Sequence, residues 1–423
     1  MEVVMPGSFA EELRRLRGER SLRDVARMAH CGKSTVADLE SGRRSPTVRL
    51  ARALDTALGG DGTLVELAEA DLQQKNARGN APATPVQDAV EVFPPGWDDD
   101  DVLRRNLLKL SAVGAATAAL AGLTPDDNLL DGTSHDLLVA HQDLRAVHGR
   151  IDNLRGAQAV YSAARDHHDQ IRGWLARTSS ETERHRLNAL AADTGGFVGF
   201  LTYDLGQAEL AITHYRDAAA HAQRAGDISS CCNLLGQTSR VLADLGHHDK
   251  ALALADRALH LAGTQAHPAV RCWLHAVRAH HHACLADSTS AHSDLDAAWN
   301  LLGHTEDGEK PPYIGYLNEA ELNKWTGHTA IRLADSRPAS IRTGLRALDA
   351  ARTNWPSRLV RGSAEVLTAS ARMYIAHGEL GEAGRLVDKA ITIATTTGSA
   401  RNLHAALDTR TLLARSAGSS VLE

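Results

Sequence analysis

One phrase recurs at a fixed spacing through the second half of the chain. Three segments, YDLGQAELAITHYRDAAAHA, ADLGHHDKALALADRALHLA and CLADSTSAHSDLDAAWNLL, align so that their alanines fall at positions 211, 251 and 291, a period of 40 residues. A fourth copy, IAHGELGEAGRLVDKAITIA, and a less regular one, GHTAIRLADSRPASIRTGLRAL, follow them. Internal repeats of about 20 to 50 residues are typical of arrays of stacked units, in which each unit buries its apolar face against its neighbours.

The repeated unit is predicted to be a pair of α-helices. Aromatic residues make up only 4% of the chain, and its second half is rich in Ala, Leu, His and Arg, a composition that favours packed helices over sheets. We expect five helix pairs across about 183–397, a further pair at 134–177 and a capping helix at 399–416. The predicted fold class is therefore all-α.

The repeats resemble tetratricopeptide (TPR) units. Gly206, Ala211, Tyr215 and Ala218 stand at TPR spacing, where small residues let two antiparallel helices approach and the large one fills the gap. The resemblance implies a TPR-like α-solenoid over 183–416 that serves as a sensor and dimerisation domain. It also implies that the first helix of each pair lines a concave groove, the usual site for a peptide in this family.

The groove-facing positions carry amides and charges beside aromatic side chains. Asn and Gln can bond the backbone of an extended peptide, and aromatic rings can hold its side chains. By the resemblance, the groove residues are Phe197, Phe200, Tyr203, Asn233, Gln237, Arg240, Trp273, His280, Glu321, Trp325 and His328. Further groove positions are Asp193, Asp204, Asp244, Cys284, Lys324, Glu365 and Arg372. For any single aromatic residue, the alternative is ordinary packing between helices.

Residues 8–70 form a separate N-terminal block of five short predicted helices. Ser8 and Ser21 are suited to cap the first two helices. The third helix, KSTVADLE, follows a short turn and has Val36 and Leu39 as its buried pair, and Pro46 suits the first turn of the fourth. Two helices joined by a tight turn match the geometry in which the second of them enters the DNA major groove.

This block resembles the lambda-repressor/Cro-like helix-turn-helix of the XRE family, most specifically in the string STVADLESGRRSP. Two positions depart from the family pattern: His30 stands where glycine usually turns the chain, and Gly32 where Ser or Thr usually caps the recognition helix. By the resemblance, the DNA-binding residues are Lys33, Ser34, Thr35, Asp38, Arg43 and Arg44. Lys33, Ser34 and Asp38 would face base edges, and the other three would hold phosphates.

The net charge of −6 excludes a uniformly basic nucleic-acid coat, so that DNA binding requires a local basic patch. Between Phe9 and Leu58 there are 11 Lys and Arg against 7 Asp and Glu, a local excess of +4. The alternative for these arginines is an ordinary solvated helix surface. The helix-turn-helix pattern favours DNA binding.

The two helical parts are joined by a predicted linker at 71–100, rich in Pro and Gly and ending in an acidic run, and by helices at 101–177 that pack on the array. Arg104 and Arg105, with the apolar run that follows to 123, look like a twin-arginine export signal. They lie about a hundred residues inside the chain, and the uncharged run of 14 residues is too short to span a bilayer. We therefore interpret 101–123 as an Ala-rich helix packed on the following domain.

Cysteine and histidine usage indicates neither a metal site nor catalysis. The five cysteines are few and lack zinc spacing, and of the run from His280 to His282 only His280 shares a helix face with Cys284. Nothing in the sequence resembles a nucleophile elbow, a phosphate loop or a carboxylate pair in a defined setting. We expect a cytoplasmic protein that is not an enzyme, with no cofactor, metal or membrane partner.

An XRE-type helix-turn-helix followed by a TPR array is similar to bacterial transcription regulators, including the peptide-sensing RRNPP-type receptors of quorum sensing. The resemblance implies a homodimer that binds a double-stranded DNA operator, acts as a repressor, and senses a small signalling peptide or another small ligand. The alternative is a scaffold whose TPR groove holds another protein, with DNA binding secondary.

Overall fold

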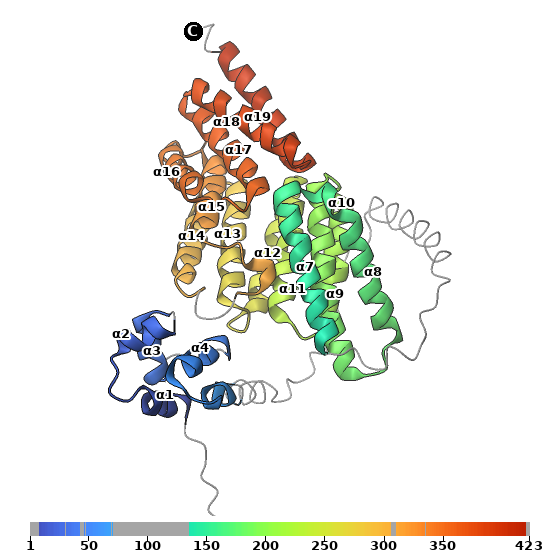
Figure 1. Cartoon of the computed structure of the whole chain (residues 1–423). Helices are drawn as coiled ribbons and strands as arrows, with labels where there is room; N and C mark the ends of the chain where they lie inside the picture. Colours follow the sequence, from blue (N-terminus) through green and yellow to red (C-terminus); the bar gives the residue numbers. More distant parts are fainter. Residues whose placement is uncertain are drawn as a thin grey trace, which may run out of the picture. The chain divides into compact units, whose positions relative to one another are not determined.

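The computed structural model describes residues 8–29, 31–42, 46, 48–68, 70, 135–305, 310–334 and 336–419. Within these ranges the chain is helical and contains no strand (Figure 1). The chain divides into two compact units, Met1–Val90 and Glu91–Glu423. The predicted linker and the twin-arginine-like stretch lie outside the described residues. The protein is all-α, with a block of short helices followed by an α-solenoid.

The described part of the N-terminal unit consists of short helices, as the sequence predicts. Their bounds are α1 (Phe9–Arg17), α2 (Leu22–Met28), α3 (Lys33–Glu40) and α4 (Val48–Leu58), and residues 63–68 are also helical. One detail of the prediction is wrong: Pro46 lies before α4 rather than in its first turn.

Capping and an apolar core hold this unit together. The Ser8 hydroxyl accepts a hydrogen bond from the Glu11 backbone at 3.3 Å, while the Glu11 carboxylate accepts one from the Ser8 backbone at 2.9 Å, which forms a reciprocal capping box at the start of α1. Val36 and Leu39 of α3 are almost fully buried, as predicted. These contacts fix which face of α3 turns inward.

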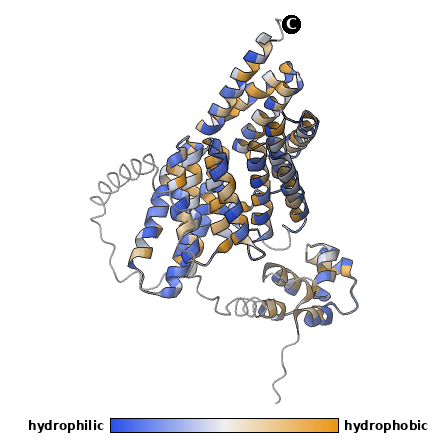
Figure 2. Ribbon diagram, turned by 180° about the vertical axis from the view of Figure 1, so that it is seen from behind, coloured by the Kyte–Doolittle hydropathy of each residue, from blue (hydrophilic) through white to orange (hydrophobic). Residues whose placement is uncertain are grey.

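In its described part, from residue 135 on, the second unit has one helix pair followed by five more pairs. The first pair is α7 (His135–Arg155) and α8 (Tyr161–Arg177), and α19 (Ala400–Ser419) ends the array. Between them lie α9 (Glu181–Asp204), α10 (Ala208–Arg224), α11 (Ile228–Asp244), α12 (His248–Ala262), α13 (Pro268–Cys284), α14 (Ser288–Leu302), α15 (Glu319–Leu333), α16 (Ala339–Asn354), α17 (Val360–His377) and α18 (Leu380–Thr396). Figure 2 shows polar and apolar residues distributed around each of these helices.

The repeated small residues pack as the sequence predicts. Ala211, Ala251, Ala291 and Ala383 have no exposed surface, which allows the two helices of each pair to approach closely. Gly378 ends α17 with a φ of 90°, a backbone conformation that favours glycine because it has no Cβ.

Polar contacts join the first and last helices of the array. The Arg361 guanidinium on α17 lies 3.1 Å from the Asp152 carboxylate on α7 and 3.2 Å from the Asp204 carboxylate at the end of α9. Ser399, just before α19, donates a hydrogen bond to Asp204 at 2.7 Å. The array is therefore curved enough for its two ends to touch.

Candidate DNA-binding helix and ligand cavity

The predicted recognition helix, α3, exposes part of the predicted set of DNA-binding residues. Lys33 in its first turn is exposed, while Thr35 and Asp38 are half-buried. Gly32 occupies the N-cap and offers no side-chain hydrogen bond, so the departure from the family pattern leaves this helix end without a side-chain cap. Ser34 belongs to α3, but its side chain, His30, Arg43 and Arg44 lie outside the described parts.

Contacts between helices hold α3 in place. The Arg17 guanidinium on α1 lies 2.5 Å from the carboxylate of Glu40, the last residue of α3. The hydrogen bond to Glu40 raises the pKa of Arg17. Arg14 also donates to the backbone carbonyl of Glu40. With Val36 and Leu39 buried, these contacts leave Lys33 at the start of α3 exposed to solvent.

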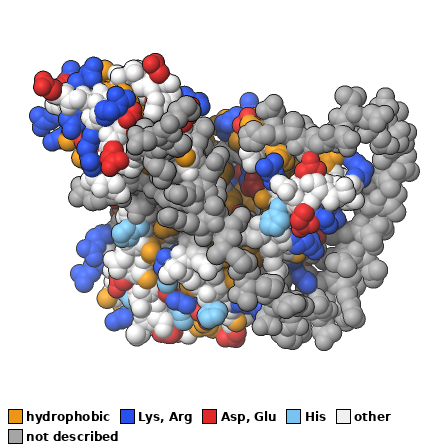
Figure 3. All heavy atoms as spheres, turned by 90° about the horizontal axis from the view of Figure 1, so that it is seen from below, with side chains coloured by type: hydrophobic (Ala, Val, Ile, Leu, Met, Phe, Trp, Pro, Cys, Tyr) orange, Lys and Arg blue, Asp and Glu red, His pale blue; other side chains and the backbone are white. Residues whose placement is uncertain are grey.

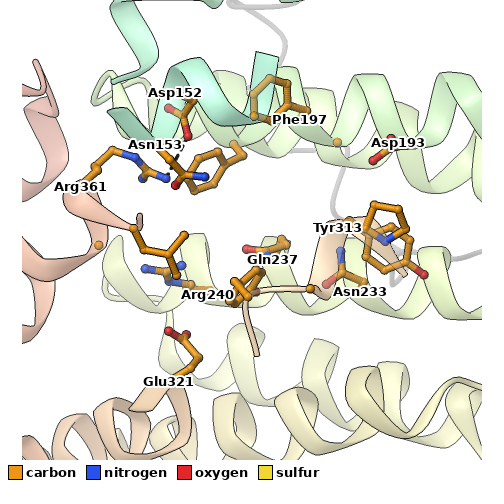
Figure 4. A pocket seen from close by; sticks show the side chains of 18 of the residues that line it. Asp152, Asn153, Asp193, Phe197, Asn233, Gln237, Arg240, Tyr313, Glu321 and Arg361 are labelled. Carbon is orange, nitrogen blue, oxygen red and sulfur yellow. Dashed lines mark hydrogen bonds and ion pairs between the residues drawn. The ribbon is translucent and has the colours of Figure 1, made fainter. Parts of the chain in front are cut away.

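A cavity of about 340 Å³ lies inside the curve of the solenoid. Figure 4 shows Asp193 and Phe197 of α9 on one side of it, Asn233 and Gln237 of α11 on another, and Tyr313 at one end. Tyr313 belongs to a short 3₁₀ helix, η5 (Pro312–Ile314). The wall therefore combines first helices of successive pairs with a connecting segment.

Several residues that line this cavity have buried polar atoms without hydrogen-bond partners. Within the described parts of the chain, the Asn233 carboxamide oxygen and the Tyr215 hydroxyl are both buried and have no such partner. The same is true of single side-chain atoms of Arg145, Asp152 and Arg361, each of which has other contacts. Because buried polar groups are nearly always paired, this wall can accept hydrogen bonds from a ligand and donate them to it.

A cluster of charges forms one end of the cavity. The Glu365 carboxylate lies 3.1 Å from Arg240, 3.3 Å from Lys324 and 3.4 Å from Arg401. Burial opposes ionisation of Glu365, but the attraction of Lys324, Arg240 and Arg401 outweighs it and holds the pKa of Glu365 well below its ordinary value. Glu365 is therefore ionised at neutral pH, where it bridges helices α11, α15 and α19.

A second cavity, of about 680 Å³, lies beyond this cluster and shares Arg240, Glu365 and Arg401 with the first. Trp325 and three histidines, His280, His328 and His404, line it. Burial lowers the pKa of both His280 and His328, which favours their neutral forms. The residues that line the two cavities include amide, aromatic and charged side chains.

Residues 8–68 match the family model described as a helix-turn-helix domain. The N-terminal unit is a helix-turn-helix domain. The family model matches residues of this unit alone, and the solenoid lies outside the match. The face drawn in Figure 3 carries Lys and Arg side chains interspersed with Asp and Glu, in agreement with the modest net charge.

No curated protein matches the chain. Among solved structures, the chain is similar to BtubC from P. vanneervenii, with 13% identity over 57% of this chain and 92% of the other, at a TM-score of 0.39. It is also similar to the Rap conjugation gene regulator of plasmid pLS20, solved in complex with the Phr* peptide. The identity there is 11% over 92% of this chain and 97% of the other, at a TM-score of 0.46.

The structure divides the predicted groove residues between the two cavities. Those that line the first are Phe197, Phe200, Asn233, Gln237, Arg240 and Glu321. Those that line the second are Tyr203, Arg240, His280, Trp325 and His328. Trp273 requires a correction, because it is fully buried and lines neither cavity. Its ring occupies space that a side chain at Gly236 would fill, since a Cβ there would lie 2.5 Å from the indole.

Several cavity residues were missed from the sequence. Asp152 and Arg361 come from α7 and from the start of α17, and Tyr313 and Trp355 from connections between helices. Repeat spacing marks the facing positions of paired helices and says nothing about connections. The only signal was the unusual PPYIGY string around Tyr313.

The described residues provide no group of three or more His, Cys, Asp or Glu side chains that could hold a metal ion. The Cys284 sulfur lies 3.6 Å from the His280 Nε2, so this predicted pair does share a face. No helix in the described part of the chain has the length and apolar character needed to cross a bilayer.

Proposed function

We propose that this protein is a sequence-specific transcription regulator, with repression as its mode of action, whose helix-turn-helix domain binds a DNA operator. The observation that carries this proposal is the exposed Lys33 at the start of α3, in a domain that matches the helix-turn-helix model. Lys33, Ser34 and Asp38 are assigned to base edges, and Thr35, Arg43 and Arg44 to phosphates. Hydrogen bonds to base edges specify sequence, while phosphate contacts set position.

The proposed signal is a short peptide held in the solenoid groove. Asn233 and Gln237 are placed to bond a peptide backbone, and Phe197 and Phe200 to contact its side chains. The unpartnered Asn233 oxygen supports this assignment, because a backbone N–H can donate to it. The charged cluster at Glu365 would then contact one end of the peptide. The proposal includes a cytoplasmic location, a homodimer, and no enzymatic activity.

The DNA part of the proposal is tested by selecting duplexes from a random pool with the full chain and sequencing those retained. The expected result is one enriched motif with two related half-sites, because paired helix-turn-helix domains read two-fold symmetric operators. Absence of any enriched motif, with weak binding that added salt abolishes, would contradict specific binding and favour the scaffold alternative.

The ligand part is tested by native mass spectrometry of the protein purified from its own host, followed by sequencing of any released peptide. A synthetic copy should then change the affinity for the selected duplex. A protein that carries no peptide, and whose DNA affinity no host extract changes, would refute the sensor role.

A further inference from the structure

Two arginines that line the second cavity have no carboxylate partner among the residues that the structure describes. Arg332, in the last turn of α15, is exposed. Arg372 of α17 is half-buried, and its Nε donates a hydrogen bond to the Thr409 hydroxyl at 2.9 Å. The other two arginines of the lining both pair with Glu365. This cavity therefore holds two guanidinium groups without a counter-charge from the described part of the chain.

These two guanidinium groups lie close enough to influence each other. Burial and the Arg332 charge lower the pKa of Arg372, and the attraction of Asp408 and Asp244 does not offset them. Asp244 instead accepts a hydrogen bond from the Tyr203 hydroxyl. Like charges that face one cavity repel each other, so an anion between them would be stabilised by both.

A buried histidine of the same cavity also lacks a partner. His280 is only 8% exposed, and its Nδ1 has no hydrogen-bond partner among the described residues. Its Nε2 lies 3.6 Å from the Cys284 sulfur, and burial raises the pKa of that thiol, so the S–H is retained and can donate to Nε2. Nδ1 then carries the imidazole proton and needs an acceptor. Burial is the largest cause of the lowered pKa of His280, and the Arg332 charge adds to it, which places this guanidinium within range of the imidazole.

The rest of the lining suits a ligand with one negative charge and an apolar body. Its charged side chains are four arginines and three carboxylates, a net charge of +1 with the histidines counted as neutral. Its apolar residues include Trp325, Leu205, Leu245 and Ile331. The volume of about 680 Å³ lies within the range of about 300–1,000 Å³ that is typical of small-molecule sites.

We propose that the second cavity binds the carboxylate of an organic acid between Arg332 and Arg372, with the apolar body of the acid against Trp325 and Ile331. Guanidinium groups match the geometry of a carboxylate, and His280 supplies a further N–H donor. The site goes beyond the proposed function, in which the peptide contacts residues of the first cavity. Two sources have this chemistry, a free small organic acid and the C-terminal residue of a peptide, and the experiment separates them.

The first test measures binding of hexanoate, decanoate and 4-phenylbutyrate to the full chain by calorimetric titration, each beside its primary amide. At least one acid should bind, and its amide should bind at least about 10-fold more weakly, because the charge-assisted hydrogen bonds are lost. Arg332→Gln/Arg372→Gln should bring acid and amide to similar affinity. Arg342→Gln/Arg346→Gln is the matched control and should bind as wild type does, since these two arginines of α16 are exposed and lie outside the lining.

The second test uses the protein without any acid. Arg332→Gln should keep or raise the melting temperature, because it removes a like-charge repulsion, whereas loss of a structural arginine would lower it. Arg361→Gln is the comparison and should lower the melting temperature, because it leaves the buried Asp152 carboxylate without its partner.

The source of the carboxylate is identified with the peptide recovered from the host and its C-terminal amide. If both amidation and Arg332→Gln/Arg372→Gln weaken its binding, the end of the peptide occupies the second cavity. If neither does, and an acid binds together with the peptide, the site takes a free acid. The proposal is overturned if no acid binds and the double variant leaves peptide affinity unchanged, or if acid and amide bind equally. These outcomes do not affect the duplex selection, which tests DNA binding separately.

Discussion

At the scale of single residues, the candidate DNA-binding site and the candidate ligand site differ in how far their residues could be assigned from the sequence. Lys33 could be assigned from the sequence because the helix-turn-helix pattern fixes both its helix and its position in the first turn. Asn233 was assigned from repeat spacing, and the structure adds that its buried oxygen has no hydrogen-bond partner among the described residues. Each residue therefore gives a distinct test.

Lys33→Ala should weaken binding to the selected duplex by about 1–3 kcal/mol and relax preference at one base pair, because a base-edge donor is lost. Fluorescence anisotropy against single-base variants of the duplex measures both effects. Lys389→Ala, at an exposed lysine of the solenoid, is the control and should change neither. If Lys33→Ala leaves affinity and preference unchanged, α3 does not read bases through this residue.

Asn233→Leu should abolish the response to the peptide while leaving the unliganded protein as stable as wild type or slightly more stable. The carboxamide is costly to bury without a partner, so replacing it with an apolar group of similar size removes a penalty of about 1–3 kcal/mol. Calorimetric titration with the identified peptide and thermal unfolding without it give the two readouts. Unchanged peptide affinity would show that Asn233 is structural.

At the scale of helices and turns, the sequence was most informative where a pattern has one physical solution. The capping residues, the buried pair of α3 and the alanines of the repeats could all be placed, because each answers a local requirement for a hydrogen bond or a close approach. Trp273 could not. Whether an aromatic residue faces the groove or the core depends on a neighbour without a side chain, Gly236, one helix away.

Gly236→Ala should destabilise the solenoid by about 1–3 kcal/mol, because the new Cβ would lie 2.5 Å from the Trp273 ring and 2.6 Å from Leu274. Gly384→Ala is the matched control. Its nearest neighbour, Leu413, is 3.6 Å away, and alanine is the better helix former, so the control should be neutral or stabilising by up to about 1 kcal/mol. Urea unfolding compares the two; equal effects would show that α11 and α13 can shift apart freely.

At the scale of the whole molecule, the cavities could not be predicted from the sequence. Repeat spacing predicts which residues face inward, but the curvature of the array decides which helices meet across the groove. Asp152 and Arg361 are 209 positions apart and belong to no common repeat, so no local pattern pairs them. The order of helices was predictable from the sequence, and the closure of the array was not.

Several histidines of the solenoid are neutral in the folded protein, which sets how stability depends on pH. Burial lowers the pKa of His214 and His221 to about 4 and that of His168 to about 3, all below the ordinary value of 6.5. The unfolded chain therefore binds these protons first as the pH falls, and the free energy of unfolding should decrease from about pH 6.5 downward. Urea unfolding at several pH values measures the slope.

His168→Gln should flatten that slope between about pH 6.5 and 5, where carboxylates are still ionised. His404→Gln is the control, because this histidine is exposed. A wild-type stability that stays constant across this window would mean that these histidines titrate alike in the folded and unfolded chain.

The contacts between the two ends of the array also bear on how the chain reaches its native state. Asp204 at the end of α9 binds Arg361 of α17 and Ser399 beside α19, groups 157 and 195 positions further along the chain. Helix pairs can form as soon as they are synthesised. The contacts of Asp204, in contrast, cannot form until the chain has been synthesised as far as Arg361 and Ser399. Loop closure over such separations is slow. Closure of the array is therefore expected to be the last folding event, and a ribosome-bound chain that ends before Arg361 would still lack the complete wall of the first cavity.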